Sequence, residues 1–223
     1  MSIITKEEIA RGYDLITDKI GQSETFYNRC LSLIKKYEGN ILDAGCGRGL
    51  LLKKIYIKNN KANLFGLDIS PKLCEIAKTN NPYADISVGD VENMEFPDSH
   101  FDYVFMTETL EHLLDYDKAI REVSRVLKKE GQLVLTVPNK DWLRYEFYNK
   151  DRKKFQPVDD HYFTFTEVKN LIVSNGFNIK KYIGSDNLYY YDPIHKYERI
   201  LAFFLPFLHK RMKRLMFLCV NKK

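Results

Sequence analysis

The chain has 223 residues, of which 44% are hydrophobic and 29% charged, a composition typical of soluble globular domains that bury a full core. Its four cysteines (Cys30, Cys46, Cys74 and Cys219) include no CxxC pair, which favours a reducing compartment and argues against a zinc site or a disulfide framework. No basic segment followed by an apolar run opens the sequence, so we expect no signal peptide and a cytoplasmic protein.

Helix and strand signals alternate along most of the chain. Thr5 and Glu8 form a capping-box pattern, which predicts a helix from near Lys6 to before Gly21, and a second helix fits 24–36. The patterns that follow predict strands at 40–44, 63–68, 86–88, 101–106 and 132–137, and helices at 50–57, from 70 onwards and at 117–128. Gly131 is expected to end the last of these helices.

The last third of the chain predicts a helix at 166–175 and strands at 178–183 and 215–220. Regular alternation of strands and helices implies a parallel sheet that is covered by helices on both faces. The sequence therefore predicts one α/β domain with a doubly wound, mostly parallel sheet.

A glycine-rich turn follows the first predicted strand, in the segment 43–49 (DAGCGRG). Glycines permit positive φ and allow a ligand to approach the backbone closely. The spacing is GxGxG, which lacks the third glycine position of the dinucleotide-binding GxGxxG pattern.

Three aspartates lie at or just after the ends of successive predicted strands: Asp43, Asp68 and Asp90. A dinucleotide would bring a pyrophosphate to the glycine turn, where nearby carboxylates are unfavourable. S-adenosylmethionine has no phosphate and carries a sulfonium, an ammonium and one carboxylate, so its net charge is positive. Taken singly, each aspartate could be a turn former or a helix cap. Together they favour S-adenosylmethionine over a nicotinamide dinucleotide.

Several segments in order resemble the motifs of class I S-adenosylmethionine-dependent methyltransferases. Segment 41–49 resembles the first motif, 67–70 the second and 89–91 the adenine-contacting motif. Segments 101–113 and 126–135 are similar to the fourth- and fifth-strand regions of the ubiquinone/menaquinone-biosynthesis type. The resemblance implies a seven-stranded Rossmann-like sheet with an antiparallel last strand. It also implies the cofactor S-adenosyl-L-methionine, with S-adenosyl-L-homocysteine as product. No metal site is expected, in line with the cysteine pattern.

The resemblance also implies roles at the methyl-donating end of the cofactor. Asp43, Gly45 and Gly47 would line the methionine part, and Thr107 would face the methyl-transfer site. Relatives of this type often place a tyrosine from an N-terminal helix over the cofactor carboxylate. Tyr13 is the candidate for that position, with a purely structural core role as the alternative.

The other end of the cofactor is assigned in the same way. Asp68 would hold the two ribose hydroxyls, and Ile69 would pack on the adenine. Asp90 would accept a hydrogen bond from the adenine amino group, with the Val91 backbone beside it.

Two histidines are candidates for removing a proton from the acceptor. His112 follows the fourth predicted strand at the reactive end of the cofactor, and its alternative role is to shape the pocket or to bond Glu111. His161 is the second candidate, because it lies where relatives of this type build the acceptor site.

These assignments divide the single domain 1–223 into four parts. A helical cap (1–38) precedes the cofactor-binding core (39–138), and a helix-strand-helix-strand segment (166–223) ends the chain. Between them, 139–165 is rich in aromatic residues and predicts an acceptor-site insertion or lid, with packing of an extra helix as the alternative. The aromatic residues of this insertion include Trp142, Tyr145, Tyr148, Phe155 and Tyr162.

The C-terminal segment is basic, since Lys196 to Lys223 carries a formal charge of +7 and leaves −2 for the rest of the chain's net +5. An apolar run at 200–208 precedes Lys210, Arg211, Lys213 and Arg214. This pattern is compatible with peripheral membrane contact through 200–214, with core packing and solvated basic side chains as the alternative.

Three other functions compete with a methyltransferase that acts on a small-molecule or lipid-like acceptor. A nicotinamide-dependent oxidoreductase is disfavoured by the glycine spacing and the three aspartates. A nucleic-acid methyltransferase is disfavoured because the chain has no Pro-Pro-Tyr or Pro-Cys element and no added RNA-binding module. A non-catalytic cofactor-binding protein of the same fold is the third.

Overall fold

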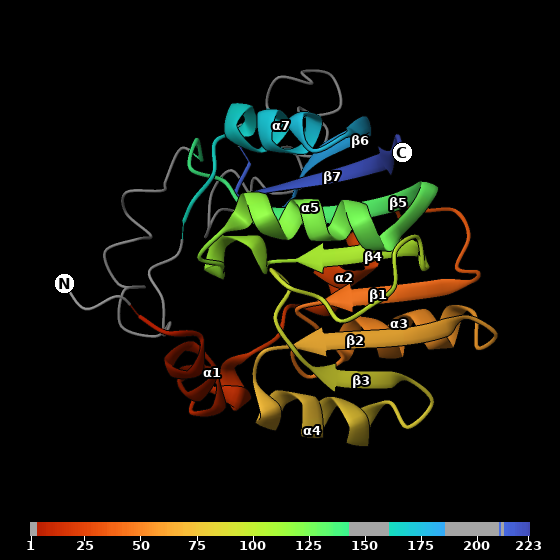
Figure 1. Cartoon of the computed structure of the whole chain (residues 1–223), viewed down its shortest axis with the longest axis vertical. Helices are drawn as coiled ribbons and strands as arrows, with labels where there is room; N and C mark the ends of the chain where they lie inside the picture. Colours follow the sequence, from red (N-terminus) through yellow and green to blue (C-terminus); the bar gives the residue numbers. More distant parts are fainter. Residues whose placement is uncertain (1–3, 143–160, 186–209, 211) are drawn as a thin grey trace, which may run out of the picture.

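The computed structural model describes residues 4–142, 161–185, 210 and 212–223, and a seven-stranded sheet forms its centre (Figure 1). The spatial order of the strands is β3-β2-β1-β4-β5-β7-β6. Strands β1 to β5 are parallel, whereas β7 runs antiparallel to both β5 and β6. This confirms the predicted doubly wound sheet with an antiparallel last strand. The strands are β1 (Asn40–Ala44), β2 (Asn63–Asp68), β3 (Asp85–Val88), β4 (Phe101–Thr107), β5 (Leu127–Pro138), β6 (Phe177–Ser185) and β7 (Arg214–Asn221).

Most helices begin where the sequence places a capping residue. The predicted capping box is present, because the Glu8 backbone N–H donates to Thr5 Oγ1 at 3.2 Å and the Thr5 N–H to Glu8 Oε2 at 2.9 Å. The second helix ends at Leu31, earlier than the predicted 36. The helices are α1 (Lys6–Asp14), the 3₁₀ turn η1 (Thr17–Lys19), α2 (Glu24–Leu31), α3 (Leu50–Lys58), α4 (Pro71–Asn80), the 3₁₀ turn η2 (Leu110–His112), α5 (Tyr116–Val126) and α7 (Phe165–Ser174).

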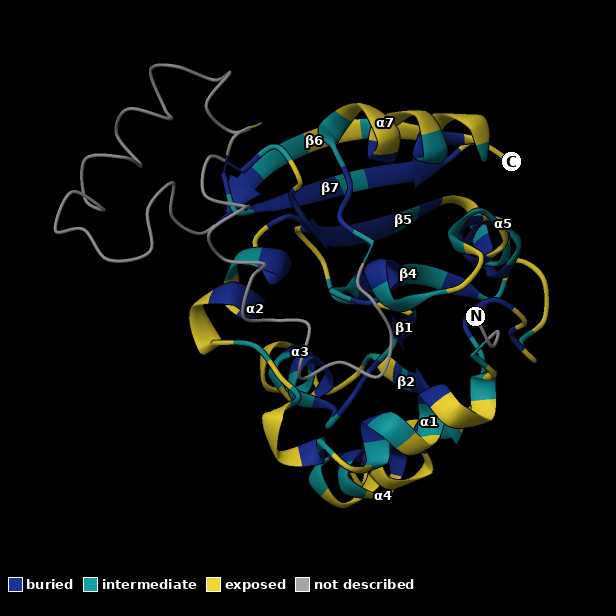
Figure 2. Cartoon of the chain, turned by 90° about the vertical axis from the view of Figure 1, so that its left-hand side faces the viewer, coloured by how far each residue is buried: buried dark blue, intermediate teal, exposed yellow. Residues whose placement is uncertain are grey.

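Two apolar clusters attach the helices to opposite faces of the sheet. Helices α2, α3 and α4 pack on one face, where Phe26 and Leu51 meet Phe105. Helices α5 and α7 cover the other face through Val123 and Ile172 (Figure 2). These side chains are nearly fully buried, and burial of each contributes roughly 1.5–3 kcal/mol to folding. Helix α1 lies beyond the carboxyl ends of β1 to β4, toward which their arrowheads point in Figure 1.

The expectation that Gly131 ends a helix is wrong. Helix α5 ends at Val126, and Gly131 lies inside β5, which begins at once. The pairing of β5 with β4 shifts register here, and Glu130 adopts a φ of 59°. A Cβ atom at position 131 would lie 2.9 Å from the Lys128 carbonyl oxygen, so the glycine permits a close backbone approach within an irregular strand.

Two of the predicted functional segments lie largely outside the described residues. Of the aromatic insertion 139–165, the described part includes Trp142 and Tyr162, both buried, whereas Tyr145, Tyr148 and Phe155 lie outside it. The apolar run 200–208 and the helix expected there also lie outside. Among the helices that are described, none is both long and apolar enough to cross a bilayer.

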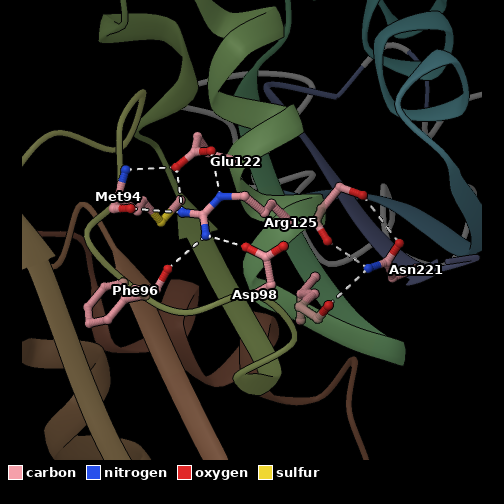
Figure 3. Close-up of polar contacts among 8 residues, drawn as sticks. Met94, Phe96, Asp98, Glu122, Arg125 and Asn221 are labelled. Carbon is pink, nitrogen blue, oxygen red and sulfur yellow. Dashed lines mark hydrogen bonds and ion pairs between the residues drawn. The ribbon is translucent and has the colours of Figure 1, made fainter.

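The connection from β3 to β4 contains no helix, and Arg125 of α5 holds it in place (Figure 3). The Arg125 guanidinium donates to the backbone carbonyls of Met94 and Phe96 at 2.8 and 2.7 Å. It also pairs with Asp98 and Glu122, each at 2.8 Å. Glu122 in turn accepts from the Met94 N–H at 2.8 Å. Hydrogen bonds from Arg125 lower the pKa of Glu122.

Replacing Arg125 with alanine should lower the free energy of unfolding by about 2 kcal/mol, because two partly buried carbonyls and two carboxylates lose a charged donor. Urea denaturation monitored by circular dichroism measures this change. The cluster lies away from the strand ends that carry the predicted site, so cofactor affinity should stay the same. A loss of stability below about 0.5 kcal/mol would contradict this role.

Candidate active site

The glycine turn after β1 adopts a backbone conformation that suits glycine. Gly45 and Gly47 have φ angles of 84° and 50°. A Cβ atom at Gly45 would lie 2.3 Å from Thr109 Oγ1, so a larger residue would collide with the loop after β4. The backbone N–H groups of Gly45 and Cys46 donate to the Leu67 carbonyl at 2.7 and 3.0 Å. These bonds tie the turn to the end of β2.

A cavity of about 400 Å³ opens at the carboxyl ends of the parallel strands, between the glycine turn, α1 and the loop after β4. The cavity falls in the volume range of small-molecule and cofactor sites. Parallel strands end at one edge of the sheet, which is why residues distant in sequence meet here. All nine residues that the sequence assigned to the cofactor line this cavity: Tyr13, Asp43, Gly45, Gly47, Asp68, Ile69, Asp90, Val91 and Thr107.

Asp68 is held by backbone hydrogen bonds at the end of β2. Its Oδ2 accepts from the Gly47 N–H at 2.8 Å, and its Oδ1 accepts from the Ser70 N–H at 3.0 Å. Burial raises the pKa of this carboxyl, and the backbone hydrogen bonds oppose that rise. A carboxylate oxygen has two acceptor positions, so each oxygen can also accept from a ligand hydroxyl. The arrangement fits a ribose diol.

Asp43 is a buried carboxylate without a full set of partners. It is 2% exposed, and among the described residues no donor reaches its Oδ1. Burial raises the pKa of Asp43 well above its ordinary value, and the nearby Asp68 carboxylate raises it further. A buried acceptor beside a second carboxylate favours a ligand that brings positive charge and donors. The ammonium and sulfonium of S-adenosylmethionine meet that requirement.

We expect Asp43→Asn to stabilise the ligand-free protein at neutral pH by about 1–2 kcal/mol while weakening S-adenosylmethionine binding. The folded-state pKa of Asp43 lies above its unfolded value. The ligand-free wild type therefore loses stability as pH rises from the unfolded-state pKa through the folded-state pKa, and a neutral amide at this position removes the loss.

Thermal melts of wild type and variant, with and without S-adenosylmethionine, measure both effects. The difference between the two ligand-free proteins should narrow as pH falls below the raised pKa. A variant that is less stable than wild type at pH 7, with unchanged affinity, would contradict the account.

Asp90 has a second role that the sequence did not predict. Its Oδ1 accepts from the Glu92 N–H at 2.9 Å and pairs with Lys6 Nζ at 3.4 Å. Lys6 also forms an ion pair with Glu92, whose Oε1 accepts from the Leu114 N–H at 2.8 Å. These contacts fasten the start of α1 over the predicted adenine end of the cavity.

His112 and Tyr13 approach each other in the cavity wall. Their rings meet edge to face with centroids 5.9 Å apart, and His112 Nε2 lies 3.8 Å from Glu111 Oε1. Both histidine and tyrosine line the cavity, and His112 is therefore placed where an acceptor proton could be removed. Glu111 is 3% exposed and can orient the His112 imidazole.

His161 is not among the residues that line the cavity. Its ring stacks on Tyr116 with centroids 5.1 Å apart and meets Phe163 at 4.4 Å. Its backbone N–H donates to the Glu111 carbonyl at 2.9 Å. The structure thus gives His161 a packing position behind the loop that carries His112.

The sequence interpretation missed a buried ion pair in the cavity wall. Arg214 was assigned to a solvated or membrane-facing basic run, which is wrong for this residue, because it is 8% exposed and pairs with Glu108. Glu108 directly follows the predicted methyl-site residue Thr107, which was the available signal. Gln22 and Lys6 also line the cavity and were missed.

Comparisons with known proteins agree with this geometry. Residues 42–135 match the family described as a methyltransferase domain. The demethylmenaquinone methyltransferase of Thermotoga maritima is 30% identical over 132 residues, which span 58% of this chain and 58% of that enzyme. An uncharacterized protein of Methanocaldococcus jannaschii is 28% identical over 78% of this chain and 82% of its own length.

Solved structures show the same fold. A protein in the complex with the Trm112 methyltransferase activator of Haloferax volcanii superposes with a TM-score of 0.76, at 18% identity, over 96% of this chain and 98% of its own. Residues 42–135 thus match a methyltransferase domain, and the sheet order and the cavity at the strand ends have the architecture of the class I, S-adenosylmethionine-dependent methyltransferase fold.

Proposed function

We propose that this enzyme transfers the methyl group of S-adenosylmethionine to a small-molecule or lipid-like acceptor at the end of the cavity formed by the loop after β4. One observation carries the proposal. Thr107 and His112 line the same cavity as the three strand-end aspartates Asp43, Asp68 and Asp90. A cofactor held by the aspartates would therefore present its methyl group to an acceptor beside that loop.

The residues of the chain would act mainly by binding and alignment. When bound, the cofactor supplies a methyl carbon that its sulfonium has already activated for in-line displacement. Asp68 would hold the ribose, Asp43 would face the ammonium and sulfonium, and Tyr13 would cover the carboxylate end. His112 would take a proton from acceptors that must lose one, with Glu111 orienting its ring.

The acceptor side has aromatic and charged walls. A small hollow next to the cavity shares Glu108, Lys213 and Arg214 with it and adds Trp142 and Tyr162. Lys213 Nζ lies 5.7 Å from the centre of the Trp142 ring. Flat or apolar acceptors suit aromatic walls. The Thermotoga maritima relative is named for demethylmenaquinone, a name that is compatible with such an acceptor class.

The experiment is to incubate the protein with methyl-labelled S-adenosylmethionine and an extract of the cells that encode it, separated into aqueous metabolites, lipids, nucleic acid and protein. We expect the label in the metabolite or lipid fraction. An Asp68→Ala variant run in parallel corrects for labelling by contaminating enzymes. Label that appears only in nucleic acid, or in no fraction, would contradict the proposal.

A further inference from the structure

Glu108 and Arg214 form a buried ion pair that joins the loop after β4 to the first residue of β7. Arg214 Nε donates to Glu108 Oε2 at 2.6 Å, and the two side chains are 10% and 8% exposed. The other oxygen, Oε1, accepts from Thr136 Oγ1 of β5 at 3.0 Å. The carboxylate therefore links three strands at the edge of the cavity.

The backbone of Glu108 is held in an uncommon conformation. Its φ of 54° lies in the left-handed region, which residues with a side chain rarely adopt. Its N–H donates to both the carbonyl and the Oγ1 of Thr136, at 3.2 and 3.0 Å. Such conformations persist where surrounding contacts fix them, and they concentrate at functional sites.

This conformation determines where the next residue lies. Thr109 Oγ1 donates to the Ala44 carbonyl at 3.1 Å and packs directly against Gly45. Gly45 belongs to the glycine turn that lines the cavity. A continuous series of contacts thus runs from Arg214 through Glu108 and Thr109 to the predicted binding turn for the methionine part of the cofactor.

Arg214 also reaches the opposite wall. Its Nη2 donates to Gln22 Oε1 at 2.8 Å, and its guanidinium carbon lies 5.0 Å from the centre of the Phe26 ring. Gln22 lines the cavity after η1. Lysine could not reproduce this arrangement, because two contacts use separate nitrogens of one planar group.

We propose that Glu108 and Arg214 are positioning residues, which fix the loop 107–112 against the glycine turn and so set both cofactor affinity and the position of His112. Loss of either partner breaks this buried ion pair and releases the strained backbone at Glu108. The part of the inference that concerns His112 rests on the proposed function. The part that concerns cofactor affinity does not.

The first test measures S-adenosylhomocysteine affinity by calorimetry for Glu108→Gln, Arg214→Met and the double variant. Each single change should weaken binding roughly 5- to 20-fold, and the double change should weaken it no further than the worse single change. Glu122→Gln and Arg125→Met are matched controls, because they break a similar Arg–Glu pair remote from the cavity and should lower only the melting temperature.

Arg214→Lys retains the charge without the geometry, and it guards against variants that do not fold. Its affinity should lie between those of wild type and Arg214→Met. If all Glu108 and Arg214 variants bind S-adenosylhomocysteine as tightly as wild type, the proposal is wrong. If wild type itself does not bind, the cofactor assignment and the proposed function fail first, and this inference fails with them.

The second test follows the imidazole signals of His112 by NMR in protein with ¹⁵N-labelled histidine, assigned with a His112→Gln variant. Glu108→Gln should shift the His112 signals and their titration with pH, whereas those of His100, which packs between Phe65 and Phe101, should stay unchanged. A merely stabilising pair would not move one histidine selectively. Unchanged His112 signals would contradict the proposal that Glu108 and Arg214 set the position of His112.

Discussion

Replacing Asp68 with alanine is expected to weaken S-adenosylmethionine binding by about 2–3 kcal/mol, roughly 30- to 150-fold, because two charge-assisted hydrogen bonds to the ribose are lost. The structure adds a second reason. Asp68 also accepts from the Gly47 N–H, so its loss would loosen the glycine turn on which we expect the cofactor to lie. Calorimetric titration of the purified proteins measures the effect.

Asp102→Ala is the matched control for this variant. Asp102 also lies on a strand, accepts from the Asn40 N–H at 2.8 Å and pairs with Lys128, but it lies at the opposite end of the sheet. We expect it to lose stability and to keep its cofactor affinity. Equal affinities for wild type and Asp68→Ala would contradict the assignment of the ribose site.

The second large effect is expected at His112. If it removes a proton from the acceptor, His112→Ala should lower kcat by a factor on the order of 10²–10⁴ and leave cofactor affinity nearly unchanged. The wild-type pH–rate profile should then show an ionisation that the variant lacks. His100→Ala removes a histidine remote from the cavity and serves as the control. A raised KM with an unchanged kcat would instead mean that His112 only shapes the pocket.

The fold and the cofactor side of the cavity were accessible from sequence for a physical reason. Parallel strands place their carboxyl ends at one edge, so residues that end successive strands must meet whatever the details of packing. Asp43 and Asp68 are such residues, and both line the cavity. Helix capping depends only on residues close together in the sequence, which is why Thr5 and Glu8 correctly predicted the start of α1.

Long-range charge pairing was not accessible. Glu108 and Arg214 are 106 residues apart, and Lys6 and Asp90 are 84 apart. Viewed in the sequence alone, Arg214 and Lys6 look like ordinary solvated basic residues. Only the packed fold brings each of them to its acidic partner. The prediction for Gly131 was wrong for a different reason. A glycine after a helical pattern locally indicates a helix end, but here the pairing of β5 with β4 ends the helix earlier and places Gly131 within a strand.

The most direct test of the central claim is a crystal structure of this chain with S-adenosylhomocysteine. We expect the ligand in the cavity at the strand ends, with both ribose hydroxyls within hydrogen-bond distance of Asp68 and the sulfur directed toward Thr107 and His112. A ligand bound elsewhere, or bound in reverse with its adenine beside Thr107, would contradict the account.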